Sequence, residues 1–216
     1  KLLVCFSGAQ DRAKVSLPRL EWQRQFEDVD CAQLFVSDPT LDLAPDIRIG
    51  WYLGSPELDL PKVLSTIIQK YMAGLEIEEV WLMGTSGGGF AALQTSALIA
   101  HSNSFAVNPQ TDVTKYRARF ARKACAHVFG EPDPGRTART VVAERLKEAQ
   151  LPVSMRIMLN VGDLHHRRDH VLPLAAEVSE FPAASLEVHE VDWGPGHVSK
   201  VPVIVKAVKA ALDATT

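Results

Sequence analysis

Cysteine is scarce in this chain, and so are long apolar runs and any large excess of charge of one sign. The three cysteines, Cys5, Cys31 and Cys125, are scattered among 216 residues. This excludes a disulfide framework, so we expect a reducing, cytoplasmic environment. No apolar run approaches the roughly 18 residues of a membrane span. The formal net charge of −3 gives no reason to expect nucleic acid or an anionic membrane as a partner.

The first residues, KLLVCFSG, have neither the long apolar region nor the cleavage site of a signal peptide. They are typical of a buried strand. The missing initiating Met is expected of a trimmed chain or of part of a longer polypeptide. The length suits one large domain, and we expect a single domain over residues 1–216.

Apolar runs alternate with helical patterns along the chain. Six runs are typical of parallel strands that are covered on both faces: residues 2–6, 32–36, 80–83, 104–107, 154–161 and 186–191. The alternation predicts an α/β fold with a mainly parallel sheet of about six strands flanked by helices. Residues 109–150, between the fourth and fifth strands, hold helical patterns and no convincing strand. We interpret them as a helical insertion.

The segment VWLMGTSGGGFAAL, residues 80–93, holds Ser86 between Gly84 and Gly88. A strand ends here and a helix begins, which is the setting in which a Gly-x-Ser-x-Gly turn presents a serine nucleophile. Small residues are needed on either side because the turn brings them together. The N–H of Gly87, at the start of the helix, can donate to an oxyanion. The alternative is a turn that only joins strand to helix. The spacing matches neither a P-loop nor a dinucleotide site.

These features resemble the α/β-hydrolase family, and the resemblance covers nearly the whole chain. It implies the α/β-hydrolase fold, with residues 109–150 as a helical cap. It also implies an acid and then a histidine downstream of the serine, with the histidine on the loop after the last strand. That loop is VDWGPGHVSK, so the resemblance implies His197 as the base. The alternative is a surface histidine without a catalytic role.

The acid is expected after the preceding strand, in MLNVGDLHHRRDH. Asp163 and Asp169 are the candidates, and we favour Asp163 because it directly follows the strand, where a side chain is rigidly held. The commoner family form has its acid three residues after a glycine, where this chain has His165. The cluster of histidines with Asp169 raises the alternative of a metal site, since His166 and His170 are four apart and can share a helix face. We expect no metal.

A second oxyanion donor is expected from the loop after the first strand, VCFSGAQ. Gly8 lets the backbone approach the substrate, and we favour the N–H of Ala9, with that of Gln10 next. The family's usual His-Gly pair is absent, so this assignment depends on position alone. Trp51 and Tyr52, in GWYLGS, are predicted to line the same cleft with Gly8 and Gln10. The alternative for the aromatic pair is a packed turn.

Two short motifs resemble a narrower branch of the family: FAVNPQTD followed by Tyr116, and LNVGDLHH with His170 and Pro173. That branch comprises domains associated with bacterial capsule, teichoic-acid and accessory Sec glycoprotein biosynthesis, and the resemblance implies acyl chemistry on a glycan. We predict a serine-dependent ester hydrolase or acyltransferase that uses a Ser86–His197–Asp163 triad and an acyl-serine, without a cofactor. Its substrate would be a small acyl ester or an acylated carbohydrate. The alternative is a non-catalytic domain that binds a glycan or a partner protein.

Overall fold

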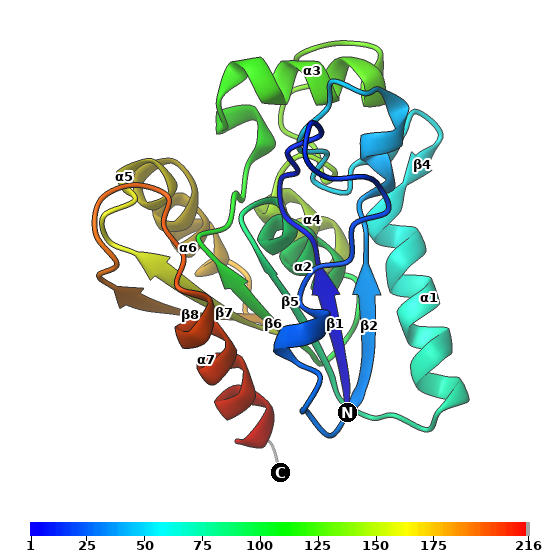
Figure 1. Ribbon diagram of the computed structural model, residues 1–216, viewed down its shortest axis with the longest axis vertical. Helices are drawn as coiled ribbons and strands as arrows, with labels where there is room; N and C mark the ends of the chain where they lie inside the picture. The colour runs from blue at the N-terminus through cyan, green and yellow to red at the C-terminus, as the bar shows by residue number, and fades with distance from the viewer. Residues whose placement is uncertain (215–216) are drawn as a thin grey trace.

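Six parallel strands form the central sheet of the computed structural model, which describes residues 1–214 (Figure 1). The strands lie in the order β2-β1-β5-β6-β7-β8, and every neighbouring pair is parallel. Their bounds are β1 (Leu2–Phe6), β2 (Ala32–Val36), β5 (Val80–Thr85), β6 (Ser102–Val107), β7 (Val153–Asn160) and β8 (Ala184–Val191). All six predicted strands are confirmed, because near-continuous apolar runs suit strands buried on both faces.

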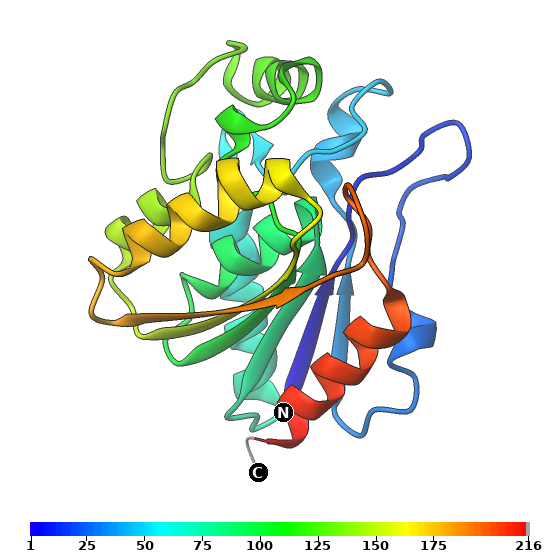
Figure 2. The ribbon, with the colours of Figure 1, turned by 90° about the vertical axis from the view of Figure 1, so that its left-hand side faces the viewer.

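Helices cover both faces of the sheet (Figure 2). On one face, α7 (Val201–Asp213) packs with Trp22 and Phe26 against side chains of β1, β5 and β6. The opposite face carries α1 (Leu60–Gly74), α2 (Gly87–Ser96), α4 (Val142–Ala149) and α6 (Leu172–Val178). Alternate residues of β1 follow this division, since Leu3 faces α7 whereas Leu2 and Val4 face α1 and α2. The sequence pattern therefore predicted the layers as well as the strands.

The predicted cap over residues 109–150 needs a correction, because its two helical patterns occupy different layers. Only the short η3 (Val113–Lys115) and α3 (Ala118–Phe129) lie above the carboxyl ends of the strands (Figure 1), where α3 contacts η2 (Pro39–Leu43) and β3 (Gly54–Ser55). α4 instead packs beside α2 and α6. Its buried Val142 and Leu146 belong to the core, so it is the crossover helix between β6 and β7.

Two smaller features complete the fold. A two-stranded hairpin of β3 and β4 (Leu58–Asp59) precedes α1, and η1 (Gln23–Gln25) follows the loop after β1. After β7 the chain forms α5 (Leu164–His166), a π-helical turn η4 (Arg167–Val171) and then α6. Such π turns are frequent at functional sites. Within residues 1–214, no helix combines the length and apolarity that crossing a membrane requires.

Candidate active site

Ser86 occupies a strained turn between β5 and α2. Its backbone angles are φ 54° and ψ −119°, a region that costs a non-glycine residue free energy and that persists only where the surroundings impose it. Here, two close approaches between backbone segments impose this conformation. A Cβ atom on Gly84 would lie 2.3 Å from the carbonyl carbon of Gly88, and one on Gly88 would lie 2.6 Å from the carbonyl oxygen of Phe6. Glycine at both positions is therefore a steric requirement of the turn.

The loop after β1 leaves one backbone N–H open beside this turn. The Ser7 N–H donates to Tyr52 Oη, the Gly8 N–H to Glu21 Oε2 and the Gln10 N–H to the Arg48 carbonyl. The N–H of Ala9, an exposed residue, has no acceptor among the described residues. This selects Ala9 over Gln10 as the available donor.

Gly87 supplies a second open N–H. It is the first residue of α2, where backbone N–H groups have no partner within the helix. A Cβ at this position would lie 2.8 Å from Ile49 Cδ1, so the chain approaches closely here as well. Helix N-termini carry partial positive charge, which favours a negative charge nearby.

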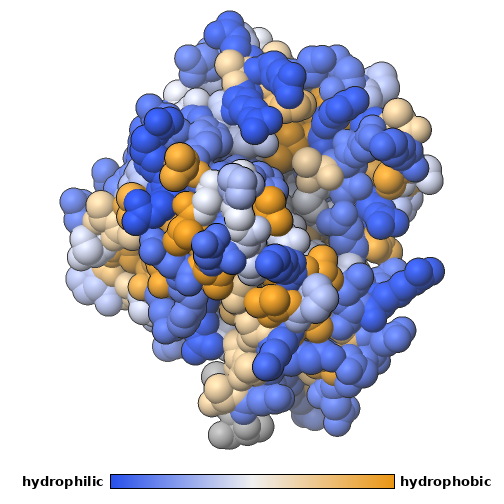
Figure 3. All heavy atoms as spheres, turned by 60° about the vertical axis from the view of Figure 1, so that its left-hand side comes forward, coloured by the Kyte–Doolittle hydropathy of each residue, from blue (hydrophilic) through white to orange (hydrophobic). Residues whose placement is uncertain are grey.

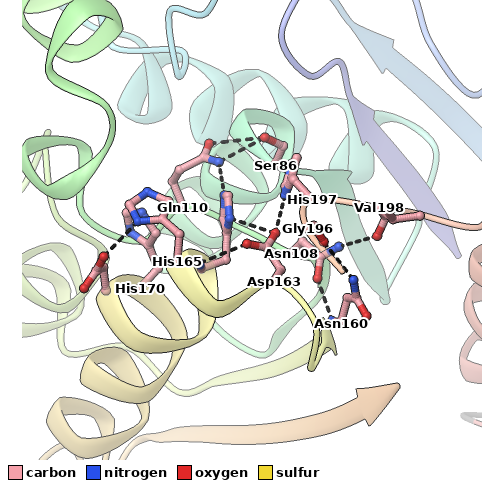
Figure 4. Close-up of polar contacts among 12 residues, drawn as sticks. Ser86, Asn108, Gln110, Asn160, Asp163, His165, His170, Gly196, His197 and Val198 are labelled. Carbon is pink, nitrogen blue, oxygen red and sulfur yellow. Dashed lines mark hydrogen bonds and ion pairs between the residues drawn. The ribbon is translucent and has the colours of Figure 1, made fainter. Parts of the chain in front are cut away.

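Asp163 and His197 contact each other across two loops. The loop after β7 presents Asp163 and the loop after β8 presents His197, whose Nδ1 lies 2.6 Å from Asp163 Oδ2 (Figure 4). Asp163 is buried, whereas the side chain of His197 is 33% exposed. Burial alone raises the pKa of Asp163, but the contacts with His166 and His197 outweigh it and hold that pKa well below its ordinary range. The carboxyl group is therefore ionised at neutral pH.

Asp169, the other candidate acid, lies apart from His197. Its carboxylate binds Arg168 and the Nδ1 of His165, the latter at 2.8 Å. Arg168 is the largest cause of a lowered Asp169 pKa, and the His165 contact adds to it. Of the two acids that the sequence left open, only Asp163 is hydrogen-bonded to His197.

Two buried asparagines hold the loop that carries His197. Asn108, which follows β6, donates to the Val198 carbonyl at 2.9 Å and accepts from the Asn160 N–H at 2.7 Å. Asn160, the last residue of β7, donates from Nδ2 to the carbonyls of Gly194 and Gly196, each at 2.9 Å. Both asparagines are fully buried. Sequence reasoning missed them: Asn108 directly follows an apolar strand in FAVNPQTD, whereas Asn160 lies inside the predicted strand of residues 154–161.

Replacing Asn160 by Ala should loosen this loop. The change leaves the Gly194 and Gly196 carbonyls and the Trp193 N–H without these partners, so we expect the free energy of unfolding to fall by about 2–4 kcal/mol. Turnover should also fall by roughly ten- to a hundredfold, because His197 loses its fixed position. Thermal unfolding and ester hydrolysis measure the two effects. Asn103→Ala, in the partly exposed part of β6, is the matched control. Equal stability of the two variants would contradict the assigned role.

Sequence reasoning gave Gln110 no role and considered His166 only as a metal ligand. Gln110 is fully buried, and its Nε2 lies 3.0 Å from Ser86 Oγ and 2.6 Å from His166 Nε2. Ser86 is thus hydrogen-bonded to Gln110 and not to His197 in this structure (Figure 4). The ring of His166 stacks on that of His197, with 4.2 Å between centroids. The only sequence signal was the position of Gln110 just after a strand.

Three residues that were predicted to line the cleft are buried instead. Trp51 and Tyr52 are 0% and 1% exposed, and Gln10 is 4% exposed. Trp51 and Tyr52 both have positive φ, 51° and 55°, which is costly for bulky residues. Trp51 Nε1 donates to Gln110 Oε1, and Tyr52 Oη accepts from the Ser7 N–H. We therefore assign the aromatic pair to positioning the site, because neither ring has solvent-accessible surface. Gly8 remains partly exposed.

The donor atoms that the structure brings together differ from the set that the sequence raised as a metal site, which was His165, His166, Asp169 and His170. Among the described residues, the donor atoms that lie within 4.8 Å of one another belong to Asp163, His166 and His197. Two of those separations, 2.6 and 2.9 Å to Asp163 Oδ2, are shorter than two zinc ligands at about 2.0–2.1 Å from the ion would have in a tetrahedral site. The contacts fit hydrogen bonds and ion pairs better. Burial and the neighbouring histidines lower the pKa of His170 to about 3.

A hollow of about 570 Å³ opens beside the turn. Its lining includes Glu21, Trp22, Thr85 and Ser199, which lie next in sequence or space to Gly8, Ser86 and the His197 loop. Exposed apolar side chains accompany the site residues in sequence: Leu164 follows Asp163 and Val198 follows His197. Figure 3 shows apolar side chains interspersed with polar ones on the face that it draws. Ser86 itself is partly exposed and His197 is exposed, so the site has access from solvent.

Comparison of the sequence with protein-family models and with curated proteins finds no match. Comparison with solved structures finds proteins of similar fold. The chain is similar to the capsule O-acetyltransferase of Neisseria meningitidis serogroup A, with a TM-score of 0.74, 16% identity, and coverage of 99% of this chain and 87% of that one. A histidine variant of that enzyme is solved in complex with CoA.

Two further solved structures have the same fold. The glycosylation-associated Gap123 complex of Streptococcus agalactiae has a TM-score of 0.67 at 14% identity, covering 99% of this chain and 41% of that chain. An S-formylglutathione hydrolase of Agrobacterium tumefaciens has a TM-score of 0.62 at 14% identity, covering 98% and 82%. These neighbours and the parallel sheet with its serine turn lead to one conclusion: the chain has the α/β-hydrolase fold, and its structural neighbours include proteins of capsule acetylation and glycosylation.

Proposed function

We propose that the chain is a serine-dependent ester hydrolase or acyltransferase, with Ser86 as the nucleophile, His197 as the base and Asp163 as the residue that orients the base. The observation that carries this proposal is the 2.6 Å contact between Asp163 Oδ2 and His197 Nδ1, made by loops that flank the strained Ser86 turn. With its Nδ1 proton donated to the carboxylate, the ring of His197 has a free lone pair on Nε2. That tautomer is the one a general base needs.

The proposed first half-reaction forms an acyl-serine. Ser86 Oγ attacks the carbonyl carbon of an ester or thioester while its proton passes to His197 Nε2. Asp163 stabilises the resulting imidazolium. The tetrahedral intermediate then collapses: the bond to the leaving group breaks, and the leaving group takes the proton from His197. The product of this step is an acyl ester on Ser86.

The negative oxygen of the intermediate needs hydrogen-bond donors. The open N–H groups of Gly87 and Ala9 are our candidates, since the neighbouring N–H groups of Gly8 and Gln10 already have acceptors. Each such donor contributes roughly a hundred- to thousandfold in rate in serine hydrolases. Because the donors are backbone groups, they are preorganised by the turns that hold them.

The second half-reaction decides between hydrolysis and transfer. His197 takes a proton from water or from a sugar hydroxyl, whose oxygen then attacks the acyl carbon and releases Ser86. The neighbouring structures of capsule O-acetyltransferase and glycosylation proteins support a carbohydrate as the acylated molecule. The exposed apolar side chains of Leu164 and Val198, which follow Asp163 and His197 in sequence, suit a short acyl chain. Hydrolysis requires the fewer assumptions, and neither reaction requires a cofactor.

The test is to trap the acyl-serine. Brief exposure to an activated acetyl ester should add one acetyl group to Ser86, as detected by mass spectrometry of the intact protein and its peptides. A suitable glycan should accelerate loss of the acetyl group if transfer is the reaction, and should have no effect if hydrolysis is. A folded protein that forms no acyl-serine with any donor would overturn the proposal in favour of a non-catalytic domain that binds a glycan or a partner protein.

A further inference from the structure

Two histidines, not one, contact the carboxylate of Asp163. His197 Nδ1 lies 2.6 Å from Oδ2 and is aligned for a hydrogen bond, whereas His166 Nδ1 lies 2.9 Å from the same oxygen without that alignment. His166 also reaches Ser86 indirectly, through Gln110. A serine site with two candidate bases needs a device that decides which of them takes the proton.

The side chain of Gln110 has only one orientation that satisfies its neighbours. Trp51 Nε1 lies 3.0 Å from Oε1, and an indole nitrogen can only donate. The amide oxygen of Gln110 must therefore face Trp51, and its NH₂ group must face Ser86 and His166. Each of the two N–H bonds then has one acceptor: Ser86 Oγ at 3.0 Å and His166 Nε2 at 2.6 Å.

The orientation of Gln110 determines the tautomer of His166. A nitrogen that accepts a hydrogen bond carries no proton, so Nε2 of His166 is bare and the ring proton is on Nδ1. Asp163 Oδ2 lies 2.9 Å from that nitrogen, close enough for an ion-pair contact but without the alignment of a hydrogen bond. An imidazolium at this position would bring its Nε2–H against the N–H of Gln110, two donors 2.6 Å apart. The contact thus opposes protonation of His166.

The surroundings of His166 act in the same direction. Burial is the largest cause of a lowered His166 pKa, with His197 and His165 adding to it and Asp163 opposing. The titratable groups that face the ring are Asp163, His165, His170, His197 and Tyr116. Only one of these, Asp163, is an anion at neutral pH, and it is shared with His197.

We propose that Gln110 and His166 decide which histidine is the base: by donating to both Ser86 Oγ and His166 Nε2, Gln110 keeps His166 neutral and leaves His197 to take the serine proton. This inference rests on the proposed function for its catalytic meaning. Because Ser86 Oγ accepts from Gln110, its own proton is free to go to His197. The competing acceptor, Gln110 Oε1, is 3.5 Å from Ser86 Oγ, a longer and weaker contact than the 3.0 Å bond from Nε2. A neutral His166 also avoids placing two positive rings face to face, 4.2 Å apart.

In this scheme Gln110 touches a reacting atom and is a catalytic residue. The hydrogen bond that Gln110 donates to Ser86 Oγ strengthens as negative charge develops on that oxygen during proton removal. His166 is a positioning residue, because it acts by accepting from Gln110 and by contacting Asp163. Experiment can separate the two roles, because Gln110 contacts Ser86 directly, whereas His166 acts through a protonation state that depends on Gln110.

Nuclear magnetic resonance of the histidine rings tests the inference without relying on turnover. The ¹⁵N-labelled protein is followed between about pH 5 and pH 8, the range in which histidines change charge, with His166→Gln to assign the signals. In the wild type, His166 should be the neutral Nδ1–H tautomer and titrate below an ordinary histidine. Gln110→Glu replaces the donor with an acceptor, so His166 should titrate above an ordinary histidine. Gln69→Glu, on the outer part of α1, is the matched control and should change nothing at His166.

Kinetics with an activated acetyl ester give the second readout. Gln110→Met, which removes the donor without adding charge, should lower kcat/KM by about ten- to a hundredfold, the effect of one hydrogen bond to a charged group. Gln110→Glu should lower it further and move the rise of activity with pH to higher pH, because His166 must first lose its proton.

Finding His166 as the Nε2–H tautomer or as an imidazolium in the wild type at neutral pH would overturn the inference, even if Gln110→Glu does not fold. An unchanged His166 titration in a folded Gln110→Glu protein would overturn it as well. The predicted spectra in a protein without an acyl-serine would instead refute the proposed function and leave the protonation scheme standing. Ser86-dependent activity in a protein whose His166 is the Nε2–H tautomer would refute the protonation scheme and leave the proposed function standing.

Discussion

Ser86→Ala should abolish ester turnover, with a loss of up to about a millionfold, and His197→Ala should cost a similar amount. In serine hydrolases the nucleophile and the base act as a unit, so removing either removes nearly the whole effect. Residual catalysis would come from the backbone donors near Gly87 and Ala9. The measurement is hydrolysis of short acyl esters, together with labelling of Ser86 by a fluorophosphonate probe.

Ser179→Ala is the matched control for this experiment. Its hydroxyl donates to the Ala176 carbonyl at the end of α6, away from the Ser86 turn, so activity and probe labelling should both persist. Activity within tenfold of the wild type in either Ser86→Ala or His197→Ala would refute the triad. Since neither substitution fills space, loss of fold is not expected to obscure the result.

Asp163→Asn should lower kcat by roughly ten thousandfold, whereas Asp169→Asn should be mild. An amide at position 163 can donate to His197 Nδ1 and so favours the wrong tautomer of the base, even with the geometry intact. Asp169 binds His165 and Arg168 and makes no contact with His197, so its replacement leaves the base in place. Steady-state kinetics of the two isosteric variants provide the comparison.

The reverse ranking would transfer the acid role to Asp169. A chelator that abolishes activity, with recovery on adding zinc, would favour a metal site over the triad. Circular dichroism of both variants checks that the fold persists. Asp163, at the N-cap of α5, also accepts from the backbone N–H of His166, a contact that asparagine keeps through its side-chain oxygen.

Local sequence patterns predicted most of the fold. β1, β5 and β6 are nearly continuous apolar runs because helices cover both faces of the sheet, and such runs are visible without any knowledge of their partners. The Gly84–Gly88 turn was also predictable from its five-residue pattern, although the steric requirement at Gly88 comes from the distant Phe6 carbonyl. The division of residues 109–150 was not. α3 and α4 both have amphipathic patterns, and such a pattern does not say which surface its apolar face will cover.

The hydrogen-bonded surroundings of the site were mostly beyond prediction. Trp51 and Gln110 are 59 residues apart in sequence, and Gln110 and His166 are 56 apart. Because aromatic residues lie near a glycine turn, the sequence suggested that they line a cleft. The fold instead buries them, and the Trp51 indole orients the side-chain amide of Gln110. Asn108 carried a weak signal, a polar residue directly after a strand, that does not reveal which loop it holds, and Asn160 lay within a predicted strand.

By itself, the sequence determined the α/β layers, the strained turn at Ser86 and the order of serine, acid and histidine along the chain, because these depend on local spacing and on burial of apolar faces. Their chemical roles remain predictions. Only the tertiary structure decided that Asp163 rather than Asp169 binds His197, that the Ala9 N–H is open while that of Gln10 is not, and that Gln110 joins Ser86 to His166. The physical reason is that these contacts form where loops from separate parallel strands meet at one edge of the sheet. Whether a side-chain hydrogen bond forms there depends on differences of a few tenths of an ångström in the distance between donor and acceptor. No local sequence pattern encodes such differences.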